Sequence, residues 1–143
     1  MRSLKSILSL HYAKYIVKKN SVWKSNAVVY QKKIMLDLIK KAERTEFGVD
    51  HFFKKINSYS EFKKRIPIRE YEEFKTYIDS IIAGGQNILW PGKPVYFCKT
   101  SGTTSGEKYI PISKESIKCH LVPARDAILS YINETRSTTI AAG

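Results

Sequence analysis

Apolar residues recur three and four positions apart along the first part of the chain, which is the spacing of one face of an α-helix. The pattern predicts an amphipathic helix over residues 3–18, with basic residues mostly between its apolar positions. A second helix is predicted over residues 26–44, where a buried stripe alternates with exposed lysines, and the segment from Thr45 to Gly48 ends it.

Ser58 and Glu61 mark the start of a third helix. A serine followed three residues later by a glutamate has the form of a capping box, in which each side chain bonds the other residue's backbone N–H. Pro67 ends this short helix, because proline cannot continue the backbone hydrogen bonding of a helix interior.

A fourth helix is predicted over residues 69–83, and Gly84 and Gly85 close it, since glycine adopts the left-handed conformation found after many helix ends. Its charged positions are expected to be solvated. Its apolar positions are expected to face inward: Tyr71, Phe74, Tyr77, Ile78, Ile81 and Ile82.

The pattern then changes to one typical of strands. After a turn rich in proline and glycine, residues 95–98 form a short apolar run that predicts a buried strand. Residues 109–112 resume an apolar pattern that Pro111 interrupts, which predicts an edge strand or an extended segment. The polar segment 101–107 is therefore expected to be a loop between two extended pieces.

The last predicted helix begins at Lys114, with Ser113 as its N-cap, and Pro123 is expected to kink it. Residues 138–142 then have the composition of the opening of another strand. Helices followed by a few short strands predict an α+β arrangement for residues 1–143, which we interpret as one domain or part of one.

Composition adds a strong positive charge. The chain has 143 residues, 43% of them hydrophobic, which is enough for a buried core, and a net charge of +12. No acidic residue precedes Asp37, although eight Lys and Arg residues do. Such an excess has two interpretations: solvated faces, or a small basic module that binds nucleic acid or an anionic membrane surface.

Other features favour a cytoplasmic protein without a metal site. Cys98 and Cys119 lack Cys-x-x-Cys spacing, so neither a disulfide scaffold nor a zinc site is expected. The histidines lie far apart in the sequence, and no apolar run approaches the roughly 20 residues of a membrane span. A transit peptide is the competing interpretation of the basic, acid-free N-terminus.

The run from Thr100 to Pro111, TSGTTSGEKYIP, carries the ingredients of a phosphate-binding loop. A triphosphate requires close backbone N–H groups, small hydroxyl donors and a cation. Two glycines allow a close approach, and Lys108 provides the charge. Hydroxyl side chains fill five of six consecutive positions: Thr100, Ser101, Thr103, Thr104 and Ser105.

Three known motifs with similar ingredients fail on spacing. A Walker A loop requires four residues between its glycines, whereas three separate Gly102 from Gly106, and Glu107 then precedes Lys108. The dinucleotide fingerprint and the G-x-S-x-G elbow are absent as well. The composition alone also fits a flexible polar hairpin loop.

The order of residues resembles a known motif. TSGTTSGEK is similar to the first core motif of the adenylate-forming superfamily, T-S-G-T-T-G-x-P-K, with Ser105 and Glu107 in place of its glycine and proline. Those departures, with the segments TEFGVDHFF and IPIREYEEFKTYIDSIIAGGQNIL, resemble the auxin-responsive (Gretchen Hagen) family of acyl acid amido synthetases over roughly residues 26–143.

The resemblance implies an α/β fold, in which N-terminal helices lead into the first strands of a large ATP-binding domain. It implies that ATP, with Mg²⁺, activates a small carboxylic acid as an acyl adenylate with release of pyrophosphate, and that the acyl group is then transferred to the amine of an amino acid. The resemblance implies no specific nucleic acid as a partner. Lys108 would be the catalytic cation. The phosphates would be bound by Thr100, Ser101, Gly102, Thr103, Thr104, Ser105, Gly106 and Lys108. This chain would be the N-terminal portion of that enzyme, inactive alone.

Overall fold

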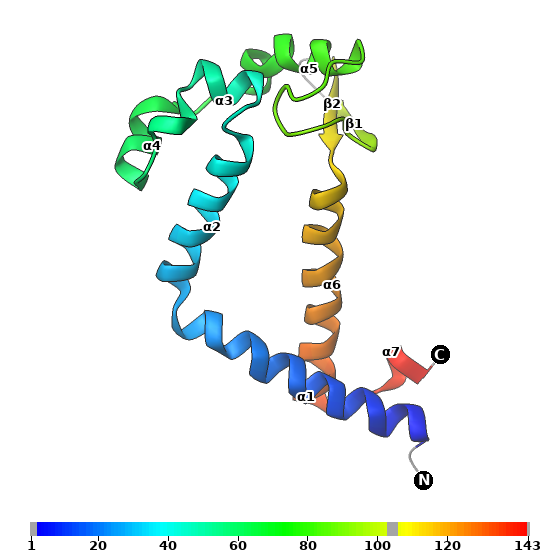
Figure 1. Cartoon of the computed structure of the whole chain (residues 1–143). Coiled ribbons are helices and arrows are strands. Elements are labelled where there is room, and N and C mark those ends of the chain that lie inside the picture. Colours follow the sequence, from blue (N-terminus) through cyan, green and yellow to red (C-terminus); the bar gives the residue numbers. More distant parts are fainter. Residues whose placement is uncertain (1–2, 103–105, 143) are drawn as a thin grey trace. The chain divides into compact units, whose positions relative to one another are not determined.

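A computed structural model describes residues 3–102 and 106–142 (Figure 1). The chain forms two compact units. One unit consists of the two ends of the chain, Met1–Tyr30 and Ile117–Gly143, and the other of Gln31–Ser116. Helices and one antiparallel hairpin build these units, which confirms the α+β class.

The unit of the chain ends is built on α1 (Leu4–Ser25), α6 (Lys114–Thr135) and α7 (Thr139–Ala142). The helix predicted over residues 3–18 is confirmed and continues for about two further turns. Ser3 caps it by accepting a hydrogen bond from the backbone N–H of Ser6 at 3.2 Å. The core packs α1 against α6 through Leu10, Ala13, Ile16, Leu129 and Ile132.

Polar contacts hold the same unit together. The Asn20 amide donates to the Asp126 carboxylate at 2.9 Å, and the Arg125 guanidinium donates to the same carboxylate at 2.6 Å. These bonds favour the ionised form, so the Asn20 amide, followed by Arg125, lowers the pKa of the Asp126 carboxyl. Asp126 therefore links α1 to α6 as a carboxylate.

The prediction of a strand over residues 138–142 is wrong, because α7 occupies Thr139–Ala142. Strand propensity in this segment reflects Thr and Ile, but a strand also needs a neighbour for its backbone hydrogen bonds. The described segment instead contacts a helix: the Thr138 hydroxyl donates to the Ser6 hydroxyl of α1 at 3.0 Å.

Short helices dominate the central unit. The predicted helix of residues 26–44 is α2, and the Ser58 cap is confirmed, since Ser58 Oγ accepts from the Glu61 N–H at 3.3 Å. The Glu61 carboxylate accepts from the Asn57 N–H, one residue earlier than a capping box requires. The elements are α2 (Ala27–Ala42), α3 (Glu46–Asp50), η1 (Phe53–Lys55), α4 (Tyr59–Arg65), η2 (Tyr71–Phe74) and α5 (Lys75–Ile82).

The helix predicted over residues 69–83 begins as the 3₁₀ turn η2 before α5. Gly84 follows it with φ +97°, as predicted from the closing glycines. Ile78 and Ile81 are buried and pack with Ile88, but Ile82 is exposed, so its predicted inward orientation is wrong. Ile81 and Ile82 are neighbours on a helix and point about 100° apart, and the core of Ile78, Ile81 and Ile88 lies on the side of Ile81.

An aromatic cluster forms the centre of the central unit. The Phe47 ring stacks on His51 with centroids 4.0 Å apart and also packs against Phe53, Phe74 and Tyr77. The Tyr77 hydroxyl donates to the Asp50 carboxylate at 2.6 Å. Burial first, and then this bond, raises the pKa of Tyr77 to about 12.

His51 has a structural role in this cluster. Arg69 can only donate, so its guanidinium donates to His51 Nε2 at 2.7 Å, and Nδ1 therefore carries the proton that it donates to the Phe47 carbonyl at 2.8 Å. Within residues 3–102 and 106–142, no group of three or more His, Cys, Asp or Glu side chains is placed to hold a metal ion.

The strands β1 (Tyr96–Gly102) and β2 (Gly106–Ile112) form an antiparallel hairpin. Both extend further into the polar run than predicted. The buried strand predicted over residues 95–98 is wrong in its burial, because all four side chains are exposed. A two-stranded hairpin covers neither face of its strands, so strand-forming residues do not by themselves produce a buried strand.

The last helix confirms its predicted start. Ser113 Oγ accepts from the Ser116 N–H at 3.0 Å, which caps α6. The helix continues through Pro123 to Thr135. Proline in a helix interior lacks the N–H for one backbone hydrogen bond, and its ring crowds the carbonyl four residues earlier, so the kink at Pro123 stays a prediction.

Candidate functional site

The described phosphate-binding candidates lie at the turn end of the hairpin. Thr100 pairs with Lys108, and Gly102 pairs with Gly106. The members of the first pair are eight positions apart in the sequence and those of the second pair four, and the antiparallel strands place them side by side. Three predicted site residues, Thr103, Thr104 and Ser105, lie outside the described residues, and Ser101 and Gly102 are described by their backbone alone.

Gly106 begins β2 with a left-handed backbone. Its φ of +80° lies in the region that side chains with a Cβ rarely adopt, so glycine is required at this position for conformational reasons. The family resemblance implies that the Gly106 backbone contacts phosphate, which stays a prediction. The described geometry shows what the residue does in the chain itself: it allows β2 to start directly after the reversal.

Lys108 lies over the ring of Tyr71. Its ammonium nitrogen is 5.3 Å from the centre of that ring, within the range of a cation–π interaction. The Lys108 side chain is only partly exposed. The aromatic ring thus positions the lysine without neutralising its charge, which leaves the charge available to an anion.

Tyr71 also holds the outer edge of β2. Its hydroxyl accepts from the Tyr109 N–H at 2.8 Å and donates to the Tyr109 carbonyl at 3.3 Å. These backbone groups point away from β1, so Tyr71 satisfies the edge that the two-stranded ladder leaves open. Tyr71 was predicted to face inward, and its bonds to Tyr109 were not predictable, because 38 residues separate the two partners and no motif connects them.

Lys99 and Glu107 form an ion pair on the hairpin. Successive side chains of a strand point to opposite faces, so Glu107 faces away from Lys108 although the two are neighbours in sequence. The bond to Lys99 lowers the pKa of the Glu107 carboxyl, and the same bond raises the pKa of Lys99. Glu107 therefore offsets the charge of Lys99 on one face, and Lys108 remains the cation of the other face.

The register gives the two hairpin faces different chemistry. Thr100 and Lys108 share one face, which therefore carries a hydroxyl donor and an ammonium group, two groups that bind anions. Glu107 is the carboxylate of the described hairpin, and its bond to Lys99 leaves it poorly suited as a metal ligand. The described residues fit a phosphate, and a metal ion there would depend on oxygens of the phosphates themselves.

A cavity of about 270 Å³ lies near the ends of the strands that are farthest from the turn. Apolar and turn residues line it, among them Ile81, Ile88, Trp90 and Pro111. Thr100 and Gly106 at the other end of the strands are exposed. Within the described residues, the predicted phosphate site is therefore an open surface.

Replacing Tyr71 with phenylalanine tests how the hairpin is held. The variant keeps the ring below Lys108 but loses both bonds to the Tyr109 backbone, and we expect it to lose about 1–2 kcal/mol of stability. Amide hydrogen exchange at Tyr109 should become faster. Tyr96→Phe is the control, because Tyr96 is an exposed tyrosine of β1. Unchanged Tyr109 protection in Tyr71→Phe would contradict this role.

Hydroxyl, glycine and lysine residues lie near the turn end of the hairpin. The family prediction rests on the order of these residues. The sequence model described as the GH3 family N-terminal domain matches residues 18–140. The chain belongs to the GH3 family. The match confirms the family predicted from the TSGTTSGEK run and includes that run.

Two curated relatives share shorter segments with this chain. It is 40% identical over 83 residues to a protein of Oryza sativa subsp. japonica named "Probable indole-3-acetic acid-amido synthetase GH3.13", a match that covers 52% of this chain. It is 37% identical over 59 residues, 40% of this chain, to "Indole-3-acetic acid-amido synthetase GH3.15" of Arabidopsis thaliana. The matched segments span 18% and 10% of those proteins.

Among the described residues, none of the helices combines the length and the apolar character that crossing a bilayer requires.

Proposed function

We propose that this chain is the N-terminal portion of an ATP-dependent acyl acid amido synthetase. The observation that carries the proposal is the hairpin register, which sets Thr100 and Lys108 opposite each other on one face in a chain of the GH3 family. Both curated relatives are named as amido synthetases. The substrates would be a small carboxylic acid and an amino acid, in a cytoplasmic setting.

The reaction has two steps. A carboxylate oxygen of the acid attacks the α-phosphorus of ATP as the bond to pyrophosphate breaks, and the amino acid nitrogen then attacks the acyl carbon as AMP leaves. This part of the enzyme must therefore mainly stabilise the negative charge of the phosphates.

The residues of the hairpin would stabilise this charge by binding the phosphates. Lys108 would place an ammonium group beside the phosphates, and the Thr100 hydroxyl would donate to them. Thr103 and Thr104, with the backbone of Gly102, would add donors from the reversal. Mg²⁺ would add positive charge through the phosphate oxygens. Tyr71 would keep Lys108 and β2 in place as a positioning residue.

The proposal includes a requirement for further sequence. Adenine, the acid and the amine need groups that converge on the phosphates from other elements, and the open hairpin surface by itself does not enclose them. The 143-residue chain alone is therefore expected to show no activity. A protein that continues into the remaining GH3 sequence is expected to be active.

Exchange of labelled pyrophosphate into ATP, measured with the complete enzyme and a panel of carboxylic acids, tests the function. We expect exchange with at least one acid, and Lys108→Ala should reduce it about 100-fold, the usual cost of removing one group that stabilises transition-state charge. Lys99→Ala is the matched control, because Lys99 faces away from Lys108 and pairs with Glu107.

Two results would contradict the proposal. One is the absence of exchange with every acid of the panel by a folded complete enzyme. The other is an equal loss of exchange in Lys99→Ala and Lys108→Ala, because the proposal assigns phosphate to only one face of the hairpin.

A further inference from the structure

Helix α1 carries a second apolar stripe, on the face opposite its buried one. The buried face contains Leu10, Ala13 and Ile16, which pack against α6. The outer stripe consists of Leu4, Leu8, Tyr15 and Val22, whose side chains are 73%, 61%, 61% and 54% exposed. Spacings of four and seven residues, about one and two helical turns, place the four side chains on one face.

The side chains of the outer stripe are mostly exposed and lie outside the buried core of their own unit. A surface helix of a globular protein normally has one apolar stripe, which faces the core, and charged residues opposite. Here large apolar side chains occupy the opposite side as well. Exposed apolar side chains that gather on one face of a helix can mark an interaction site.

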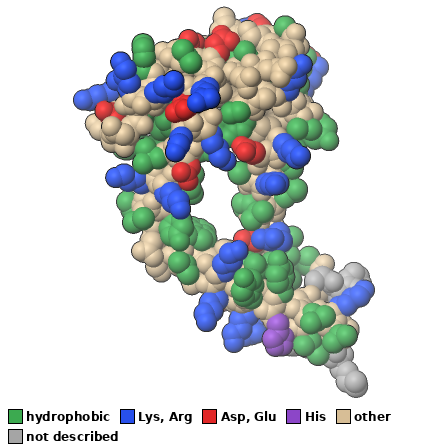
Figure 2. All heavy atoms as spheres, viewed as in Figure 1, with side chains coloured by type: hydrophobic (Ala, Val, Ile, Leu, Met, Phe, Trp, Pro, Cys, Tyr) green, Lys and Arg blue, Asp and Glu red, His purple; other side chains and the backbone are tan. Residues whose placement is uncertain are grey.

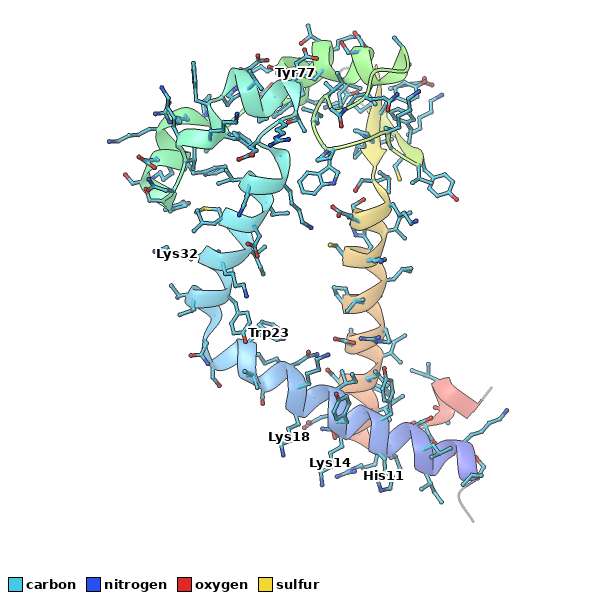
Figure 3. The ribbon with its side chains drawn as sticks, viewed as in Figure 1. His11, Lys14, Lys18, Trp23, Lys32 and Tyr77 are labelled. Carbon is cyan, nitrogen blue, oxygen red and sulfur yellow. The ribbon has the colours of Figure 1, made fainter. Side chains whose placement is uncertain are left out.

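Exposed lysines lie along both sides of the outer stripe. Lys14 and Lys18 are one turn apart on one side, and Lys5 and Lys19 are about four turns apart on the other side. Figure 3 shows Lys14 and Lys18 projecting from the same side of α1, with His11 beside them. Figure 2 shows the same mixture of blue and green side chains along this helix.

The charge of this surface has one sign. Neither α1 nor the chain before Asp37 contains an acidic residue. Positive charge on both sides of an apolar stripe complements an anionic surface with an apolar interior, because the lysine stems can lie along the apolar part while their ammonium groups reach outward.

We propose that the outer stripe of α1 docks on the surface of an anionic membrane. Leu4, Leu8, Tyr15 and Val22 enter the interface between headgroups and acyl chains, and the four lysines bind lipid phosphates. The helix lies in the plane of the membrane and does not cross it. Leu10, Ala13 and Ile16 stay packed on α6, so the unit of the chain ends binds as a folded unit.

Nucleic acid fits the same surface less well. Its backbone is bound by cations and polar donors, and a double helix offers no apolar layer for the four stripe residues. The family match begins at residue 18, so most of the stripe lies outside the matched segment. The proposal is independent of the hairpin and of amido synthetase activity, because it rests on a different unit of the chain.

Flotation of the protein with vesicles tests the proposal. We expect binding to vesicles of phosphatidylglycerol and phosphatidylcholine in equal parts, much weaker binding to pure phosphatidylcholine, and a steep loss of binding with added salt. The double variant Leu8→Gln, Tyr15→Gln keeps the charge and should bind about tenfold or more weakly. Both positions are exposed, and circular dichroism checks that the helix content is unchanged.

A matched control removes exposed apolar side chains elsewhere. Tyr59→Gln with Ile68→Gln changes two exposed residues of the central unit and should leave vesicle binding unchanged. The proposal is overturned by absent vesicle binding, by equal binding to neutral vesicles, or by an equal loss in the control. Binding to a DNA duplex without vesicle binding, unaffected by the Leu8 and Tyr15 changes, would also overturn it in favour of a nucleic-acid surface.

Discussion

Replacing Gly48 with alanine is expected to destabilise the central unit by about 3 kcal/mol or more. A Cβ at this position would lie 2.0 Å from the Ala42 carbonyl oxygen and 3.1 Å from Thr45 Oγ1. The carbonyl cannot move away easily, because it accepts bonds from the Thr45 N–H at 3.0 Å and from the Thr45 hydroxyl at 2.7 Å. The turn from α2 into α3 therefore has no room for a side chain at Gly48.

Chemical denaturation followed by circular dichroism measures this effect. Gly84→Ala is the control: its φ of +97° strains an alanine, but no atom lies within 4 Å of the added Cβ. We expect the control to lose only about 1–2 kcal/mol. Equal losses in the two variants would show that the close approach at Gly48 is not what requires glycine there.

Truncation of Phe47 to alanine is expected to cost about 3–5 kcal/mol, the usual range for a buried phenylalanine. The ring is the shared partner of the aromatic cluster: its centroid lies 5.4 Å from Tyr77, 5.7 Å from Phe74 and 5.8 Å from Phe53. The Arg69 guanidinium also lies 5.8 Å from it. Removing the ring leaves a cavity that several elements border, so a small local shift cannot fill it.

Urea unfolding of Phe47→Ala, compared with Phe52→Ala, tests this account. Phe52 is an exposed phenylalanine five residues along the chain, and its truncation should cost less than about 1 kcal/mol. If Phe52→Ala were as destabilising as Phe47→Ala, the aromatic cluster would not be the main source of stability in the central unit.

The candidate site was predictable from sequence in its composition but not in its geometry. The order of residues from Thr100 to Lys108 identified the family that the match over residues 18–140 confirms. The strand register decided which residues share a face, and it separated Lys108 from its neighbour Glu107. Tyr71 could not be found from sequence, because its role depends on a contact across 38 residues.

The sequence by itself determined the features that depend on a few neighbouring residues. Ser58 and Ser113 cap their helices and Gly84 follows α5 in a left-handed conformation, since each of these acts over one helical turn. The helix starts and ends predicted from them agree with α4, α5 and α6.

Only the tertiary structure decided what depends on distant partners. Residues 95–98 have strand propensity, but their burial required a covering layer that the described hairpin lacks. Thr139 and Ile140 also favour a strand, yet this segment forms α7 against α1. Propensity is a property of single residues, whereas burial and strand pairing are properties of the surroundings, which is why these two predictions were wrong.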